Sequence, residues 1–115
     1  MKKNVKDVSV QKMNVGEKVY IQVLLSPTEM PNFAMRKFIV EKGGFIPLHS
    51  NLVEHEQYYL SGEAEIELNG EKFTVKQGDF IYMPAGSKHS YRNIGEENFE
   101  FLCIVPNKED KVSIF

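Results

Sequence analysis

The sequence predicts an all-β protein, a small barrel or double-sheet jelly roll made of one domain. Alternation of apolar and polar residues recurs along the chain, and no window keeps a 3.6-residue apolar period. Turn residues such as Gly43-Gly44, Ser61-Gly62, Asn69-Gly70 and Gln77-Gly78 separate nearly all of these runs. Short strands at even spacing, with no helix between them, are typical of closed barrels and jelly rolls.

Nine segments carry the β pattern, and each is rich in β-branched or aromatic residues or alternates with period two. In chain order, the predicted strands are Lys18 to Leu25, Ala34 to Val40, His49 to Asn51, His55 to Leu60, Ala64 to Leu68, Lys72 to Val75, Phe80 to Met83, His89 to Asn93 and Phe99 to Val105. The first dozen residues and Lys108 to Phe115 are expected to be edge or tail segments.

Asn69-Gly70 is the strongest local signal in the chain. This dipeptide favours a type I′ hairpin turn, which needs positive φ at both central residues. The two-residue loop pairs Leu68 with Glu71 and so sets the register of both strands.

Composition limits the size of the fold and the choice of partner. With 115 residues, of which 42% are hydrophobic, the chain can bury one core, so we expect a single domain spanning residues 1–115, with a barrel core over about 34–106. The 14 basic residues are outnumbered by 16 acidic ones and form no basic block, which argues against nucleic acid as a partner. The apolar runs are too short for a membrane span, and a lone Cys103 fits a reducing compartment, so we expect a cytoplasmic protein.

All three histidines lie in predicted strands beside turns. His49 and Asn51 are two residues apart and would share one face of a strand. His55 opens the next strand and His89 opens a strand beyond the hairpin, so a rolled sheet could bring them to one barrel mouth. Imidazole is the commonest metal ligand at neutral pH, which makes a metal site the leading interpretation over three structural histidines.

These residues resemble the cupin family. Gly43, His49, Asn51, His55 and Gly62 follow its first motif, G-x5-H-x-H-x3-E-x6-G, except for Asn51 and His55, and Gly78 to Asn93 follows the second, G-x5-P-x-G-x2-H-x3-N. The resemblance implies a cupin jelly-roll barrel with metal ligands at His49, Asn51, His55 and His89. Histidine at the glutamate position is similar to the small manganese-type cupins of thermophiles with four histidine ligands.

Asn51 departs from both ligand patterns. An amide oxygen is a weak neutral donor, so an open coordination position is expected. The expected cofactor is one divalent transition metal, with manganese or iron favoured and nickel or zinc also compatible.

The leading function is a metal-dependent oxidoreductase of the dioxygenase type acting on a small molecule. The alternative is a non-catalytic module that binds a small molecule, and no general acid or base is named.

Strand alternation also predicts which side chains line the pocket. If His55 faces inward, alternation predicts that Gln57 and Tyr59 also face inward and that Glu56 faces outward. If His89 faces inward, Tyr91 does so as well. The last strand should turn Phe101 and Cys103 inward. Arg36 and Phe38 are expected to face the barrel as well, and an inward arginine needs either an anionic, carboxylate-bearing substrate or a salt bridge to a neighbouring glutamate. We assign neither Glu54 nor Glu56 as a metal ligand.

A homodimer is expected from apolar residues on outward faces. Lys18 to Leu25 is apolar on both of its faces, and Leu102 and Ile104 point away from the predicted barrel. A second subunit is the simplest cover, and strands within residues 5–25 are the expected interface. The resemblance also implies a dimer.

Overall fold

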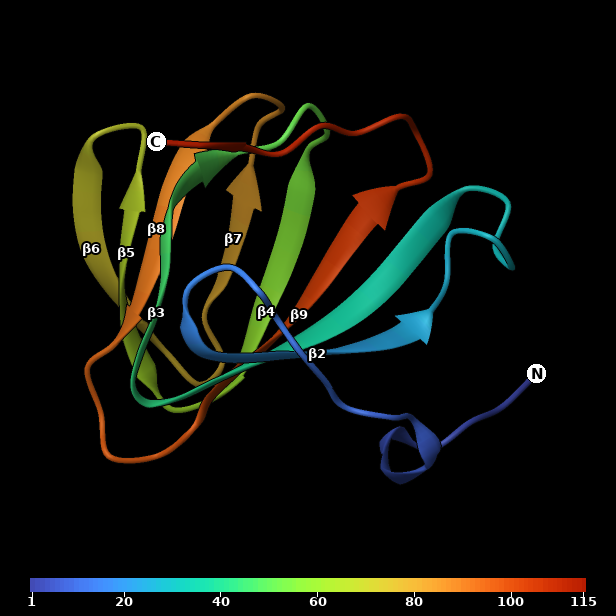
Figure 1. Ribbon diagram of the computed structural model, residues 1–115, viewed down its shortest axis with the longest axis horizontal. Coiled ribbons are helices and arrows are strands. Elements are labelled where there is room, and N and C mark those ends of the chain that lie inside the picture. The colour runs from blue at the N-terminus through green and yellow to red at the C-terminus, as the bar shows by residue number, and fades with distance from the viewer.

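Strands account for nearly all of the regular structure. The computed structural model describes residues 1–115, and Figure 1 shows its strands curling around one interior. The elements are a 3-10 turn, η1 (Val5–Asp7), and ten strands, β1 (Gln11–Lys12), β2 (Glu17–Leu25), β3 (Phe33–Ser50), β4 (His55–Ser61), β5 (Glu63–Leu68), β6 (Glu71–Lys76), β7 (Phe80–Met83), β8 (Lys88–Asn93), β9 (Phe99–Pro106) and β10 (Ser113–Ile114).

The strands form one antiparallel sheet that rolls up on itself. Its hydrogen-bonded path runs β6-β5-β8-β3-β9-β4-β7, and β2 and β10 add to β3. The first part of β3 pairs with β2 and β9, whereas its last residues pair with β8 and β10. One strand therefore belongs to both walls of the roll. The predicted all-β barrel is confirmed.

The expected turn at Gly43-Gly44 is wrong. The chain continues through both glycines as one 18-residue strand, and His49 lies near its end rather than in a strand of its own. Gly43 has φ of +79°, and a Cβ on Gly44 would lie 2.7 Å from the carbonyl oxygen of Glu17 on the neighbouring strand. The glycines thus allow β3 to bend from one wall to the other while β2 packs against it.

The predicted hairpin is confirmed. Asn69 and Gly70 have φ of 49° and 84°, and β5 pairs with β6 with Leu68 opposite Glu71. Ala64 and Ile66 are buried, as is Val75 across the hairpin, so one face of it closes the interior.

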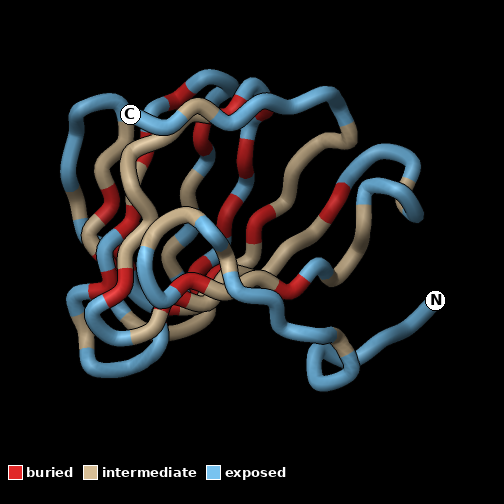
Figure 2. Tube along the Cα trace, viewed as in Figure 1, coloured by how far each residue is buried: buried red, intermediate tan, exposed pale blue.

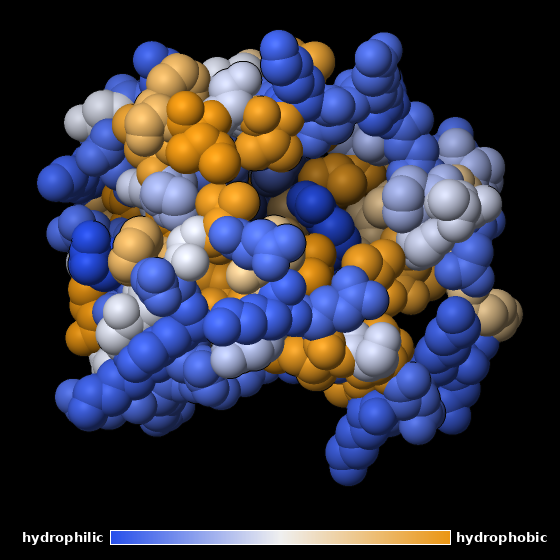
Figure 3. Space-filling view, viewed as in Figure 1, coloured by the Kyte–Doolittle hydropathy of each residue, from blue (hydrophilic) through white to orange (hydrophobic).

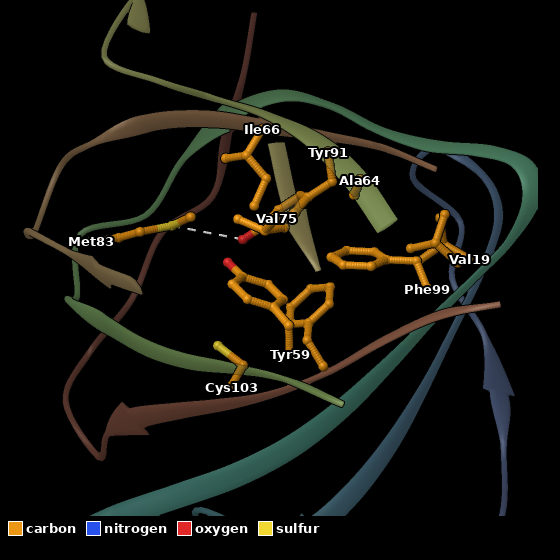
Figure 4. Close-up of a cluster of buried hydrophobic side chains, with 11 residues drawn as sticks. Val19, Tyr59, Ala64, Ile66, Val75, Met83, Tyr91, Phe99 and Cys103 are labelled. Atoms are coloured by element: carbon orange, nitrogen blue, oxygen red, sulfur yellow. Dashed lines mark hydrogen bonds between the residues drawn. The ribbon is translucent and has the colours of Figure 1, made fainter. Parts of the chain in front are cut away.

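The core lies inside the roll and extends away from the barrel mouth. Figure 2 shows buried residues along several strands, and Figure 4 shows the hydrophobic side chains that pack together inside the roll. Tyr59, Phe99 and Phe101 are the largest fully buried side chains, and their rings lie 5.3 to 5.7 Å apart. These rings pack together in the core, and Phe101 also lines the cavity described below.

Both chain ends are more ordered than tail segments would be. The buried Gln22 of β2 donates hydrogen bonds to the carbonyls of Val5 and Val8, so the N-terminal turn covers part of the outer face of that strand. At the other end, β10 pairs with β3 opposite His49 and Ser50. The sequence missed both contacts because neither segment carries a strong alternation. The structure contains no helix of the length and apolarity needed to cross a membrane.

Candidate metal centre

A cavity of about 290 Å³ opens at one end of the roll, and a hollow with hydrophobic and hydrophilic atoms is visible on the face shown in Figure 3. Most of its lining is apolar, but the polar residues at its wall are the ones the sequence pattern singled out. The lining includes His49, Asn51, His55, His89, Arg36, Phe38, Gln57, Tyr91, Phe101 and Cys103.

Three strands bring the histidines together. His49 on β3 and His89 on β8 are direct cross-strand partners, with ring centroids 4.1 Å apart. His55 begins β4, and its ring centroid lies 5.5 Å from that of His89. Residues separated by as many as 40 positions in the chain thus share one cavity.

Backbone carbonyls set the tautomer of two of these rings. Nδ1 of His49 lies 2.8 Å from the carbonyl oxygen of Pro47, and Nδ1 of His89 lies 3.1 Å from that of Ser87. A carbonyl oxygen only accepts, so each neutral ring carries its proton on Nδ1 and keeps a lone pair on Nε2. Nε2 of His89 is buried and has no hydrogen-bond partner.

His55 is held by sulfur instead. Its Nδ1 lies 3.4 Å from Sγ of Cys103, while its Nε2 is buried without a partner. Coordination through this Nε2 requires Nδ1 to donate to the sulfur, which accepts weakly.

Burial keeps the rings uncharged. It lowers the pKa of His55 to about 3, with the positive charge of Arg36 acting in the same direction, and lowers the pKa of His89 to about 4. The pKa of His49 is also lowered by burial. Neutral imidazole is the form that binds metals.

Asn51 lies just beyond the end of β3 and is buried. The sequence predicted Asn51 on the same strand as His49, but β3 ends at Ser50. Asn51 nevertheless lines the same cavity as His49. Its Nδ2 donates a 2.9 Å hydrogen bond to Oδ2 of Asp110, and its Oδ1 is buried with no partner.

The donor set fits a metal ion, although it is not gathered into a closed site. As the side chains lie, no three His, Cys, Asp or Glu groups are placed so that they could hold one ion. Asn51 would add an oxygen ligand of a further residue type. Small rotations of the histidine rings would change where each Nε2 points. Buried polar atoms normally have partners, so three unpartnered donors on one wall are the feature that a bound ion would satisfy.

Arg36 makes no salt bridge, so the expected pairing with a neighbouring glutamate is not formed. Its Nη2 donates to Sγ of Cys103 at 3.3 Å, its Nε is buried without a partner, and its Cζ lies 5.2 Å from the centre of the Phe38 ring. Cross-strand register places Arg36, Cys103 and Gln57 in one row over β3, β9 and β4. A positive charge thus lies at the cavity wall with no carboxylate beside it.

Gln57 links the cavity wall to the core. Its Oε1 accepts from the hydroxyl of Tyr59 at 2.8 Å, and its Nε2 donates to the hydroxyl oxygen of Tyr91 at 2.6 Å. Tyr91 lines the cavity, whereas Tyr59 lies behind Gln57 and does not. Burial raises the pKa of both phenols and of the Cys103 thiol, so these groups stay protonated.

Sequence reasoning missed several residues of the site. Val112 and Ile114 from the C-terminal segment and Met13 and Val15 before β2 line the cavity as well, together with Ile46. Glu54 accepts from the hydroxyl of Tyr82 and Glu56 is exposed, so neither reaches the cavity. No sequence signal marks the two terminal segments, because their contacts to the site are long-range.

A rolled antiparallel sheet with three histidines at one cavity defines a small barrel protein of the jelly-roll type. The chain belongs to the cupin family, because residues 36–105 match the model of the cupin domain.

Comparisons with known proteins agree with this family. The chain is 38% identical over 71 residues to an uncharacterized protein of Methanocaldococcus jannaschii, a match that covers 61% of this chain and 57% of that protein. It is 34% identical over 85 residues to an oxalate-binding protein of Thermotoga maritima, covering 71% and 70%. Among solved structures, the polyketide cyclase RemF of Streptomyces resistomycificus has the same fold, with a TM-score of 0.91 at 23% identity over 99% of this chain and 84% of that one.

Proposed function

We propose that the chain binds one divalent transition metal through Nε2 of His49, His55 and His89, with the oxygen of Asn51 beside them. The observation that carries this proposal is the set of three buried donor atoms without partners, Asn51 Oδ1, His55 Nε2 and His89 Nε2, at one cavity. Three imidazoles and an amide suit manganese or iron, and nickel or zinc is also compatible with them.

The ligand we propose for this metal is a small carboxylate-bearing molecule. All four protein donors are neutral, so the full positive charge of the ion would remain to attract an anion. Arg36 adds a second positive charge at the same cavity, and its buried Nε has no partner. A guanidinium binds a carboxylate through two parallel hydrogen bonds. The oxalate-binding relative supports this ligand class.

The activity we propose is that of a metal-dependent oxidoreductase. A weak amide donor leaves a coordination position to small ligands, and a bound transition metal supplies Lewis acidity and redox chemistry there. The chain's own contribution is to orient the substrate carboxylate with Arg36 and to exclude water with Phe38, Phe101 and the apolar lining.

A second candidate is a module that binds the same ligand without turnover. Tyr59, Tyr91 and Cys103 all keep their protons because burial raises their pKa values, so none of them supplies a base. This observation favours storage or sensing of the ligand over a reaction that needs proton removal.

Calorimetric titration of oxalate into metal-free and Mn²⁺-loaded protein tests the shared part of both candidates. We expect binding only to the loaded protein, since the carboxylate needs the ion. Equal binding to both forms, or to neither, contradicts the proposal. Oxygen uptake by the loaded protein with small carboxylates then separates the oxidoreductase, which consumes oxygen, from the binding module, which does not.

A further inference from the structure

Asp110 connects the C-terminal segment to the cavity wall. Its Oδ2 accepts from Nδ2 of Asn51 at 2.9 Å, and its Oδ1 accepts from the backbone N–H groups of Leu52 and Lys111 at 2.7 and 2.8 Å. Both carboxylate oxygens are therefore engaged, one by the side chain of Asn51 and one by backbone.

This pairing fixes which end of the amide faces the cavity. A carboxylate only accepts hydrogen bonds, so the NH₂ group of Asn51 must point to Asp110 and the carbonyl oxygen must point the other way. The reversed amide would place two oxygens against each other. The buried Oδ1 that results has no partner within the protein, although Asn51 lines the cavity.

The segment that carries Asp110 is itself attached to the site. Ser113 and Ile114 form β10, which pairs with β3 opposite Ser50 and His49, and the N–H of Phe115 donates to the carbonyl of Leu48 at 3.0 Å. Figure 1 shows this last stretch of chain running along the rim of the roll toward β8. The chain just after Asp110 is therefore anchored to β3.

We propose that Asp110 is a positioning residue that orients the Asn51 amide, so that an oxygen rather than an NH₂ group faces the metal. This inference rests on the proposed function for its consequence, metal affinity, but the orientation itself exists in the metal-free protein. An NH₂ group has no lone pair for a cation, so the reversed amide would repel the ion instead of contributing a donor.

Asp110→Asn is the sharpest probe, because it keeps size and shape. The new side chain has only one accepting oxygen, which the backbone N–H groups of Leu52 and Lys111 would keep as their acceptor. Its NH₂ group would then face Asn51. The Asn51 amide must therefore reverse, so that its oxygen accepts a hydrogen bond from this NH₂ group. We expect Mn²⁺ affinity to fall about tenfold, within the range typical for groups that orient metal ligands, while the C-terminal segment remains anchored.

Mn²⁺ titrations of chelator-stripped Asn51→Ala, Asp110→Asn and the double variant test whether Asp110 acts through Asn51. In the Asn51→Ala background, Asp110→Asn should change the affinity less than twofold, because no amide remains to orient. An equal loss in both backgrounds overturns the proposal. Phe115→Ala removes an exposed side chain of the same segment outside the cavity lining and keeps the backbone hydrogen bond to Leu48. It is the matched control and should bind Mn²⁺ like the parent; a tenfold loss there would show that the assay responds to any change in this segment, and also overturns the proposal.

Side-chain amide NMR of the metal-free protein keeps the two proposals separable. We expect one Asn51 NH₂ proton, assigned by its disappearance in Asn51→Ala, to exchange slowly and to lose this protection in Asp110→Ala. Unchanged exchange means that Asp110 does not orient the amide. If the parent binds no Mn²⁺ while this proton is protected, the metal proposal fails and the orientation stands.

Discussion

His49 and His89 face each other across β3 and β8, with ring centroids 4.1 Å apart and ring planes inclined at 55°. Two protonated rings at this distance would repel each other, and burial alone already disfavours the charge. The histidine wall is therefore stable only in its neutral form, which ties the stability of the metal-free fold to pH.

The metal-free protein should lose stability as the pH falls from about 7.5 to about 5. The unfolded histidines take up protons near their usual pKa of 6.5, whereas the folded pKa is about 3 for His55 and about 4 for His89. The unfolded state binds more protons in this window, so protonation favours unfolding, and the loss continues until the folded pKa values are reached. Urea unfolding midpoints after chelator treatment measure the effect.

A His55→Gln, His89→Gln variant is the control for this pH dependence. Its midpoint should vary less over the same window, because two of the groups responsible are gone. A parent midpoint that stays flat from about pH 7.5 to about pH 5 would show that the rings are not held neutral by the fold.

Arg36→Met should make the metal-free fold more stable and ligand binding weaker. The parent carries a positive charge at the cavity wall without a carboxylate partner, and methionine packs into a similar space at no such cost. Oxalate binding to the Mn²⁺-loaded variant should weaken by roughly tenfold or more, since a charge-assisted hydrogen bond is lost. Thermal unfolding and calorimetric titration check the two effects. A destabilised variant that binds oxalate as the parent does would assign Arg36 a structural role.

Asn51→His should tighten Mn²⁺ binding and reduce the access of water to the ion. Imidazole is a better donor than an amide oxygen, and the residue already lines the cavity. Titration of the metal-free forms measures affinity, and water-proton relaxation of the Mn²⁺-loaded forms measures exchangeable water. If both quantities match the parent, position 51 does not reach the ion.

The chain should be a dimer in solution. Val23 on β2 is 37% exposed, and an apolar outer face that includes Phe80, 78% exposed, and Tyr82 is open to water. Faces of this kind are usually covered. Light scattering at micromolar concentration should give twice the chain mass of 13.2 kDa. A mass equal to that of one chain would contradict the dimer. If the dimer forms, two variants locate its interface. A dimer that is lost in Phe80→Ser but persists after removal of residues 1–15 would show that the interface does not involve the N-terminal strands.

Local patterns explain what the sequence could predict. The register of β5 with β6 follows from Asn69-Gly70 alone, because a two-residue turn leaves one pairing. The inward positions of Gln57, Tyr91 and Cys103 follow from alternation, since each lies an even number of residues from another buried position on its strand.

Long-range contacts explain what it could not. Gly43-Gly44 looks like a turn, and only the packing of β2 against it makes it a bend within β3. Asp110 lies 59 residues from Asn51, in a segment without periodicity, so no local signal pairs them. The unpaired state of Arg36 likewise depends on which strands become its neighbours.

The metal content of the double variant His49→Ala, His89→Ala is the most direct test of the central claim. Elemental analysis of parent protein purified without added metal should find about one transition-metal ion per chain, and the variant should contain none, because two of its three imidazole donors are gone. Ser90→Ala, a substitution on the same strand as His89, should retain the parent's metal. Equal metal in the parent and the double variant would contradict the assignment of these histidines as ligands.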